Sequence, residues 1–267
     1  KAIDAVAGLQ EGTELLYSIT DTSAGLFTAD AIAGADKPYL KNASAITITD
    51  AINYAKASAL SAERTGLSGV TFVIDSNYGG FDGNPTGDAI RAAATSNTLT
   101  DSEANLFDAN NLALPNLAKA GTVVLKDALA TINAATVSQK SSVAQFEITD
   151  NNLVPGNAAA IKQVNELSAL KTTKYTIASS TLTALKGTAD GVSTFVNGAQ
   201  KVFVDGALTV AEYNQLDAIT NASIVVNITD KLVNLVAANA ASAVAAGKVV
   251  GNQIGGNQTV VTVTDKT

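Results

Sequence analysis

The sequence predicts an α/β solenoid of about ten strand–helix repeats, with a period of about 26 residues and a parallel sheet on one side. Two observations carry this expectation. Short segments of alternating apolar and polar residues recur along the chain and end in aspartate, and most of them are followed by a segment with helical spacing of apolar residues. We expect residues 1–267 to form a single domain.

The strands are recognised by their period-two alternation. Examples are YSITD at 17–21, AITITD at 45–50, FEITD at 146–150, VNITD at 226–230 and VTVTD at 261–265. Alternation of this kind predicts a strand with one face in the core. The position two residues before the aspartate is apolar in every repeat, and this apolar column comprises Ile19, Ile48, Val73, Leu99, Leu125, Ile148, Ile177, Phe203, Ile228 and Val263.

Helices are expected after most strands. The clearest are ALATINAATVSQ after Asp127, NAAAIKQVNELSAL at 157–170, LTVAEYNQLDAI at 208–219 and the alanine-rich segment 232–250. A helix between two strands of one sheet must cross back over it, which makes the strands parallel and the crossover right-handed. No single repeat can bury its own apolar face, so stacking on neighbouring repeats has to do so.

The composition restricts both the core and the partners. The chain is 46% hydrophobic but only 5% aromatic, so its core must be built from Val, Ile, Leu and Ala. Charged residues make up 15%, below the usual value of about a quarter, so the surface is expected to be mostly neutral and polar. The net charge of −7, without any run of Lys or Arg, argues against nucleic acid as a partner. The most apolar segment, 232–250, contains Asn and Lys and predicts a buried helix rather than a membrane span.

Several kinds of chemistry are excluded by residues that the chain lacks. It contains no Cys and no His, so disulfides, thiolate or imidazole zinc sites and Ser-His or Cys-His catalysis cannot occur. Two carboxylates can still act as acid and base, but nothing in the sequence singles out a pair. We therefore expect a protein that is not an enzyme.

The repeated aspartate has two interpretations. An aspartate at the junction of strand and helix can accept hydrogen bonds from free backbone N–H groups and offset the positive helix end. Alternatively, aspartates along one sheet edge can bind calcium, which takes six to eight oxygen ligands. We call these residues the aspartate row, and its members are Asp21, Asp50, Asp75, Asp101, Asp127, Asp150, Asp205, Asp230 and Asp265, with Ser179 replacing one aspartate.

The best candidate for a calcium site is the insertion DSNYGGFDGNPTGD at 75–88. It gathers oxygen ligands in a glycine-rich loop, although its spacing is not that of an EF-hand. A surface turn composed of Asn, Asp and Gly is the alternative. The candidate metal ligands are Asp75, Asn77, Asp82, Asn84 and Asp88.

Three segments carry a resemblance to a known group of proteins: YSITDTSAGLFTAD, LTDSEANLFDANNLAL and VDGALTVAEYNQLDAI. The chain resembles the repeat regions of large bacterial secreted and cell-surface proteins, of the S-layer or type-1-secreted adhesin kind. The resemblance implies an extracellular structural or adhesive role, often with calcium, and it supplies no catalytic residue. The Gly-Gly-x-Gly-x-Asp calcium repeats of many such proteins do not occur here.

Our first hypothesis is a structural component of an exported bacterial surface layer or filament, which self-associates through the solenoid ends or the terminal strand. A glycan- or receptor-binding adhesin module, bacterial or from a phage, is the alternative, and a polysaccharide-active enzyme comes third. We expect an extracellular or cell-surface location and no membrane span. Because the sequence begins at Lys1 without an initiator Met, we also expect a piece of a longer or processed chain.

Overall fold

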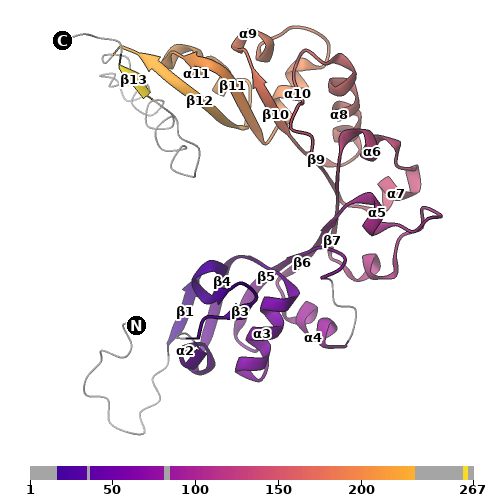
Figure 1. Ribbon diagram of the computed structural model, residues 1–267, viewed down its shortest axis with the longest axis vertical. Coiled ribbons are helices and arrows are strands. Elements are labelled where there is room, and N and C mark those ends of the chain that lie inside the picture. Colours follow the sequence, from indigo (N-terminus) through magenta and orange to yellow (C-terminus); the bar gives the residue numbers. More distant parts are fainter. Residues whose placement is uncertain (1–16, 35–36, 81–84, 232–260, 264–267) are drawn as a thin grey trace. The chain divides into compact units, whose positions relative to one another are not determined.

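The computed structural model describes residues 17–34, 37–80, 85–231 and 261–263 (Figure 1). Two compact units are distinguished by their contacts. Unit 1 comprises Lys1–Thr100 and Pro115–Thr122, and unit 2 comprises Asp101–Leu114 and Val123–Thr267. Strands and helices alternate in both units, which confirms a mixed α/β fold.

Unit 1 contains helices of 4 to 11 residues between strands of 2 to 8 residues. Its elements are β1 (Ser18–Asp21), α1 (Ser23–Leu26), β2 (Phe27–Thr28), β3 (Ala31–Ile32), α2 (Lys37–Asn42), β4 (Ala45–Ile52), α3 (Tyr54–Arg64), β5 (Val70–Ser76), α4 (Pro85–Ala93), β6 (Ser96–Asp101) and the 3₁₀ helix η2 (Pro115–Lys119).

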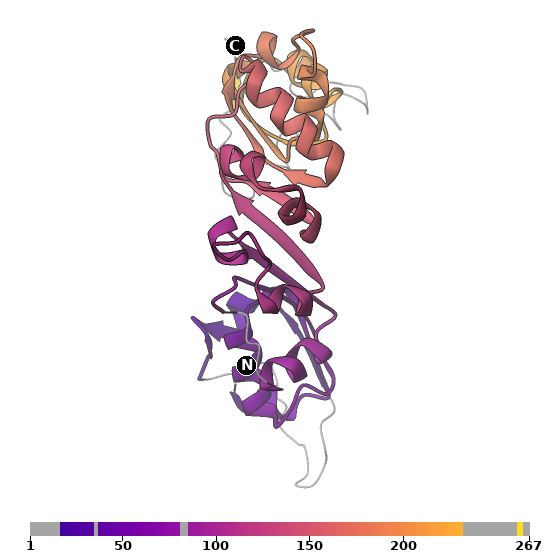
Figure 2. The same ribbon diagram turned by 90° about the vertical axis from the view of Figure 1, so that its right-hand side faces the viewer.

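Unit 2 continues the alternation with a longer helix, α8, which contacts β9 and α10 (Figures 1 and 2). Its elements are α5 (Glu103–Leu106), β7 (Thr122–Asp127), α6 (Leu129–Ala134), α7 (Val137–Ser142), β8 (Gln145–Ile148), α8 (Ala158–Leu170), β9 (Thr172–Lys174), β10 (Thr176–Ser180), α9 (Leu182–Leu185), α10 (Val192–Gly198), β11 (Lys201–Leu208), α11 (Val210–Asp217), β12 (Ser223–Asp230) and β13 (Val261–Val263).

The predicted parallel pairing is confirmed. One parallel sheet has seven strands, in the order β1-β4-β5-β6 in unit 1 and β7-β8-β9 in unit 2. A second parallel sheet, in unit 2, has the order β10-β11-β12-β13. Antiparallel pairing is confined, in the described residues, to the two-residue strands β2 and β3 and a single bridge between Phe107 and Ala113.

Most of the predicted apolar column lies in the core. Ile48, Leu125, Ile148 and Ile228 are at most 6% exposed, as are the helix residues Ile161, Val164 and Leu167 on one face of α8. Leu99 and Ile177 are also buried, and Ile19 is half-buried. The side chain of Val263 lies outside the described residues. The core is therefore aliphatic, as the composition required.

The phase of the alternation is wrong at Val73 and Phe203. Val73 is 37% exposed while its neighbours Phe72 and Ile74 are buried, and in β11 the buried residues next to Phe203 are Val202 and Val204. Burial alternates without a break along β5, so Val73 and Asp75 lie on the same outer face, whereas in β11 Asp205 directly follows the buried Val204. The aspartate therefore has no fixed phase relative to the core face, and counting back from it gives the wrong face at these two positions.

One predicted strand, around 174–179, is divided between the two sheets. β9 ends at Lys174 and β10 begins at Thr176, with the buried Tyr175 between them. The Tyr175 ring stacks on Phe195 with centroids 5.3 Å apart, and its hydroxyl donates to the Phe195 carbonyl at 2.6 Å. Tyr175 thus anchors the strand break to α10. The helix expected at 232–250 lies outside the described residues.

Candidate functional site

The helices that follow β1, β4 and β11 are capped by residues that lie one, three and four positions after the aspartate of the row. The side chains of Thr22, Asn53 and Thr209 accept hydrogen bonds from the first turns of α1, α3 and α11. Thr209 forms a full capping box with Glu212. Asp21, Asp50 and Asp205 lie before these residues, so they are not the N-caps of their own helices.

Three aspartates of the row instead cap the helix of the preceding repeat. Both carboxylate oxygens of Asp50 accept from Ser23, one from its N–H and one from its hydroxyl at 2.7 Å. Asp127 accepts from the Glu103 N–H at 3.1 Å, and Asp150 accepts from the Leu129 N–H. Ser23, Glu103 and Leu129 are the first residues of α1, α5 and α6, respectively. The capping interpretation is thus confirmed at these positions, in a form that joins one repeat to the next.

The register of the strands explains this contact. Asp21 pairs with Ile48, not with Asp50, and Asp127 likewise pairs with Ile148. In both of these strand pairs the second strand is therefore displaced by two residues from the alignment of the aspartates, whereas Asp75 pairs with Thr98, three residues before Asp101. Asp50 consequently lies opposite Ser23, the residue two positions after Asp21. Ser23 begins α1, so its backbone N–H has no partner within the helix.

The same aspartates also organise the local turn. The carboxylates of Asp21, Asp101 and Asp127 each accept from the N–H of the following residue, at 2.7 or 2.8 Å. Asp127 therefore joins its own turn to the preceding helix. The Ser23 hydroxyl, followed by the Ser23 N–H, lowers the pKa of Asp50 because both donate to the charged carboxylate.

Other members of the row make different contacts or none. Asp75 accepts from the Thr100 hydroxyl at 3.0 Å. Asp205 is exposed in the bulge of β11 and has no side-chain hydrogen bond within the described part of the chain. Ser179 is exposed in β10, whereas the side chain of Asp230 and all of Asp265 lie outside the described residues.

At the other end of the strands, side chains at or after the end of one helix donate to carbonyls at the end of the preceding helix. Arg64 donates to the carbonyls of Leu40 and Ala43 at 2.6 and 2.9 Å. Thr220 donates to the Val196 carbonyl at 2.8 Å. Sequence reasoning missed these contacts, because an isolated Arg or Thr near a helix end carries no periodic signal.

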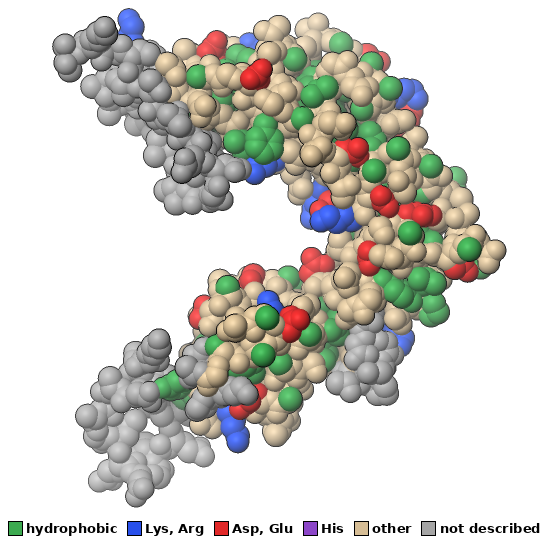
Figure 3. Space-filling model, in the orientation of Figure 1, with side chains coloured by type: hydrophobic (Ala, Val, Ile, Leu, Met, Phe, Trp, Pro, Cys, Tyr) green, Lys and Arg blue, Asp and Glu red, His purple; other side chains and the backbone are tan. Residues whose placement is uncertain are grey.

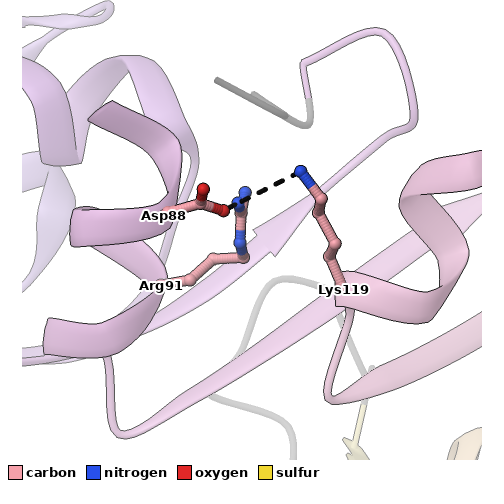
Figure 4. Close-up of polar contacts among 3 residues, drawn as sticks. All are labelled: Asp88, Arg91 and Lys119. Atoms are coloured by element: carbon pink, nitrogen blue, oxygen red, sulfur yellow. Dashed lines mark hydrogen bonds and ion pairs between the residues drawn. The ribbon is translucent and has the colours of Figure 1, made fainter. Parts of the chain in front are cut away.

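The calcium candidate is only partly described, since Asp82 and Asn84 lie outside the described residues. Asn77 accepts from the Gly80 N–H at 2.7 Å, which is the expected turn contact. On α4, Asp88 pairs with Arg91 and lies 3.9 Å from Lys119 of η2 (Figure 4). Cations thus already neutralise one candidate ligand. Within the described ranges there is no cluster of three or more acidic residues that could hold a metal ion, and the calcium expectation stays a prediction.

The surface is largely neutral. On the face drawn in Figure 3, charged side chains are scattered among uncharged polar groups and backbone. In the part of the chain that the structure describes, no helix combines the length and apolarity needed to cross a bilayer. Exposed aromatic side chains on one face would favour a glycan-binding module, but Tyr54 is 4% exposed and thus not accessible, and Phe81 lies outside the described residues.

Comparison with known proteins gives no relative. No family model, curated protein or solved structure matches the chain. The resemblance to bacterial surface-protein repeats therefore stays an expectation from the sequence, and function has to be argued from the geometry.

Proposed function

We propose that the chain is a non-enzymatic structural component of an exported bacterial cell-surface layer or extracellular filament. In this proposal its strand–helix repeats, about ten in number, form a solenoid that self-associates through its ends or its terminal strand. One observation supports it most: carboxylates of the aspartate row cap the helix of the preceding repeat. These acidic groups hold the stack together.

The energetics suit a scaffold. One helix cap stabilises by about 1 kcal/mol, and in a stacked array such interface contributions repeat along the chain. The carbonyl contacts of Arg64, Tyr175 and Thr220 secure the opposite ends of the repeats in the same way. A neutral polar exterior with few charges is compatible with close packing of copies in a layer or filament.

The terminal strand offers a route to assembly. β13 pairs in parallel with β12, from Ile228↔Val261 to Asp230↔Val263. The same three-residue pairing, made with β12 of another copy, would join subunits by strand addition, in which main-chain hydrogen bonds supply the affinity.

Deletion of residues 257–267 tests this assembly. We expect the deletion to abolish self-association while unit 1 stays folded, because it removes β13 but leaves β1–β6 intact. Light scattering and electron microscopy of the native and truncated chains measure the change. The matched control is Leu112→Ser, an exposed position of unit 2, which should assemble like the native chain.

Assemblies that persist unchanged after the deletion would refute strand addition as the joining contact. Imaging the native chain with and without a calcium chelator addresses the calcium expectation in the same experiment. Dissolution of the assemblies by the chelator would support bound calcium.

The alternative function, a glycan-binding adhesin module, is favoured by a cavity in unit 2 whose polar wall consists of Glu103, Asn111, Thr131 and Gln139.

A further inference from the structure

A solvent-open cavity of unit 2 lies among α5, α6, α7 and the loop that follows α5. Figure 1 labels these three helices. The volume of the cavity is about 430 Å³, within the range of roughly 300–1,000 Å³ typical of small-molecule sites. Alanines of α6 form an apolar wall, while Glu103, Asn111, Thr131 and Gln139 form a polar one. Such a combination favours a ligand that is polar at its edge and apolar on one face.

Gln139 organises the polar wall. Its side chain is 2% exposed, and its Oε1 accepts from the Thr136 N–H at 2.8 Å within a capping box. Its Nε2 donates to Glu103 Oε1 and, at 3.4 Å, to Asn111 Oδ1. Gln139 of α7 is thereby joined to α5 and to the loop after it, whose residues Glu103 and Asn111 lie 36 and 28 residues earlier in the sequence.

These bonds determine which polar groups remain available. Gln139 occupies one oxygen of Glu103 and the Oδ1 of Asn111. No further side-chain hydrogen bond of Glu103, Asn111 or Thr131 occurs among the described residues. A carboxylate oxygen, an amide NH₂ and a hydroxyl are therefore free at the cavity wall.

The loop that presents Asn111 is itself ordered by a local contact. The Asp108 carboxylate accepts from the N–H groups of Asn110 and Leu112, both at 2.8 Å. Asn111 has a φ of 61°, a left-handed conformation that asparagine tolerates better than most residues. The amide donor is thus positioned before any ligand arrives.

We propose that this cavity binds a neutral saccharide unit through two neighbouring hydroxyl groups. One hydroxyl donates to the free Glu103 oxygen, and the next accepts from Asn111 Nδ2. Hydrogen bonds to a charged acceptor are roughly twice as strong as neutral ones. The sugar's C–H face packs against the alanine methyl groups of α6.

Other ligand classes fit the same wall less well. An anionic ligand is repelled by Glu103 and by the net charge of −7. Calcium requires six to eight oxygen ligands, and Glu103 is the one carboxylate among the described residues that line the cavity. The saccharide site does not depend on the scaffold role, so either proposal can fail without the other.

The test uses the full chain and a panel of methyl glycosides of glucose, galactose, mannose and N-acetylglucosamine, with N-acetylneuraminate as the anionic comparison. We expect saturable binding of at least one neutral glycoside in the millimolar range and none of N-acetylneuraminate. Amide chemical-shift changes should centre on Glu103, Asn111, Thr131 and Gln139.

Two near-isosteric variants sharpen the result. Asn111→Asp replaces the NH₂ donor that faces the ligand by a carboxylate oxygen. Glu103→Gln replaces the free carboxylate oxygen by an NH₂ donor. Each should weaken binding about tenfold or more, because a polar pair is lost. Glu166→Gln, at an exposed position of α8, should bind like the native chain.

Circular dichroism melting establishes whether each variant is folded. Loss of binding in a folded variant, with Glu166→Gln unaffected, supports the site. The site is excluded by a native chain that binds no neutral glycoside, by preferential binding of N-acetylneuraminate, or by full affinity in both folded variants. If both variants unfold, the amide chemical-shift changes of the native chain on adding glycoside decide whether the site exists. Changes centred away from the cavity overturn the proposal.

Discussion

The position of an aspartate relative to the strand end decides what its carboxylate does. Asp50 and Asp150 reach the first N–H of a helix in the preceding repeat, whereas Asp205 makes no side-chain hydrogen bond among the described residues. The motif is the same in sequence, but the register differs. A carboxylate contributes only where an unpaired backbone donor comes within reach.

Asp50→Asn tests the contribution of this contact. We expect the variant to lose about 1 kcal/mol of unfolding free energy, since the amide keeps one acceptor but loses the charge and the second acceptor. Urea unfolding near neutral pH measures the loss. Asp205→Asn, which removes an exposed carboxylate, should stay within about 0.5 kcal/mol of the native chain.

The same contact sets a dependence on pH. The folded-state pKa of Asp50 is lowered from its ordinary value of 3.8, so its stabilisation is present above that pH and is lost as the pH falls through the folded-state pKa. The difference between native chain and Asp50→Asn should therefore shrink below about pH 4. A difference that stays constant through this range would show that the charge is not responsible.

Gly206 is a second position where one residue decides local structure. It lies in the bulge of β11 with a φ of 82°, and a Cβ added there would have no other atom within 4 Å. Only the unfavourable backbone conformation therefore disfavours a larger residue at this position. Gly206→Ala should cost about 1–2 kcal/mol, the penalty of a left-handed L-residue. Gly156→Ala, also in open space but without a positive φ, is the matched control for thermal unfolding. Equal melting temperatures for the two variants would contradict the account.

At the scale of the elements, the aspartate has no fixed position relative to the core face of its strand. In β5 the alternation is unbroken, so Val73 shares the outer face with Asp75. Both β4 and β11 contain a bulge, with three residues between the pairs Thr47↔Thr71 and Ala51↔Val73 and three between Phe203↔Val225 and Ala207↔Asn227. Asp50 is the last of its three residues but Asp205 is the middle one, so counting back two residues reaches the core at Ile48 and misses it at Phe203.

Phe146 tests the assignment of the core face in β8. It is fully buried and lies on the face shared with Ile148. Phe146→Ala should destabilise unit 2 by about 3–5 kcal/mol, since it leaves a cavity in an otherwise close-packed core. Val137→Ala is the control, because Val137 is 83% exposed and its truncation should change stability by no more than about 0.5 kcal/mol. A small effect of Phe146→Ala on denaturant unfolding would show that the face is assigned wrongly.

At the scale of the whole molecule, parallel pairing in both sheets agrees with the predicted crossovers. The break at Tyr175 was not foreseen, because KYTIAS reads as one continuous strand. The candidate saccharide site was not foreseen either. Its polar wall needs Glu103, Asn111 and Gln139 together, and nothing in their spacing indicates that they meet.

The sequence by itself determined the alternation of strands and helices, the aliphatic core and the parallel direction of the strands. These features follow from local periodicity and from the short connections that a crossover requires. The tertiary structure alone decided the displacement of two or three residues between neighbouring strands, the bulges, and the helices that Asp50, Asp127 and Asp150 cap. They depend on which backbone donors of one repeat stand opposite the acceptors of the next, and that register is settled only when the repeats pack together.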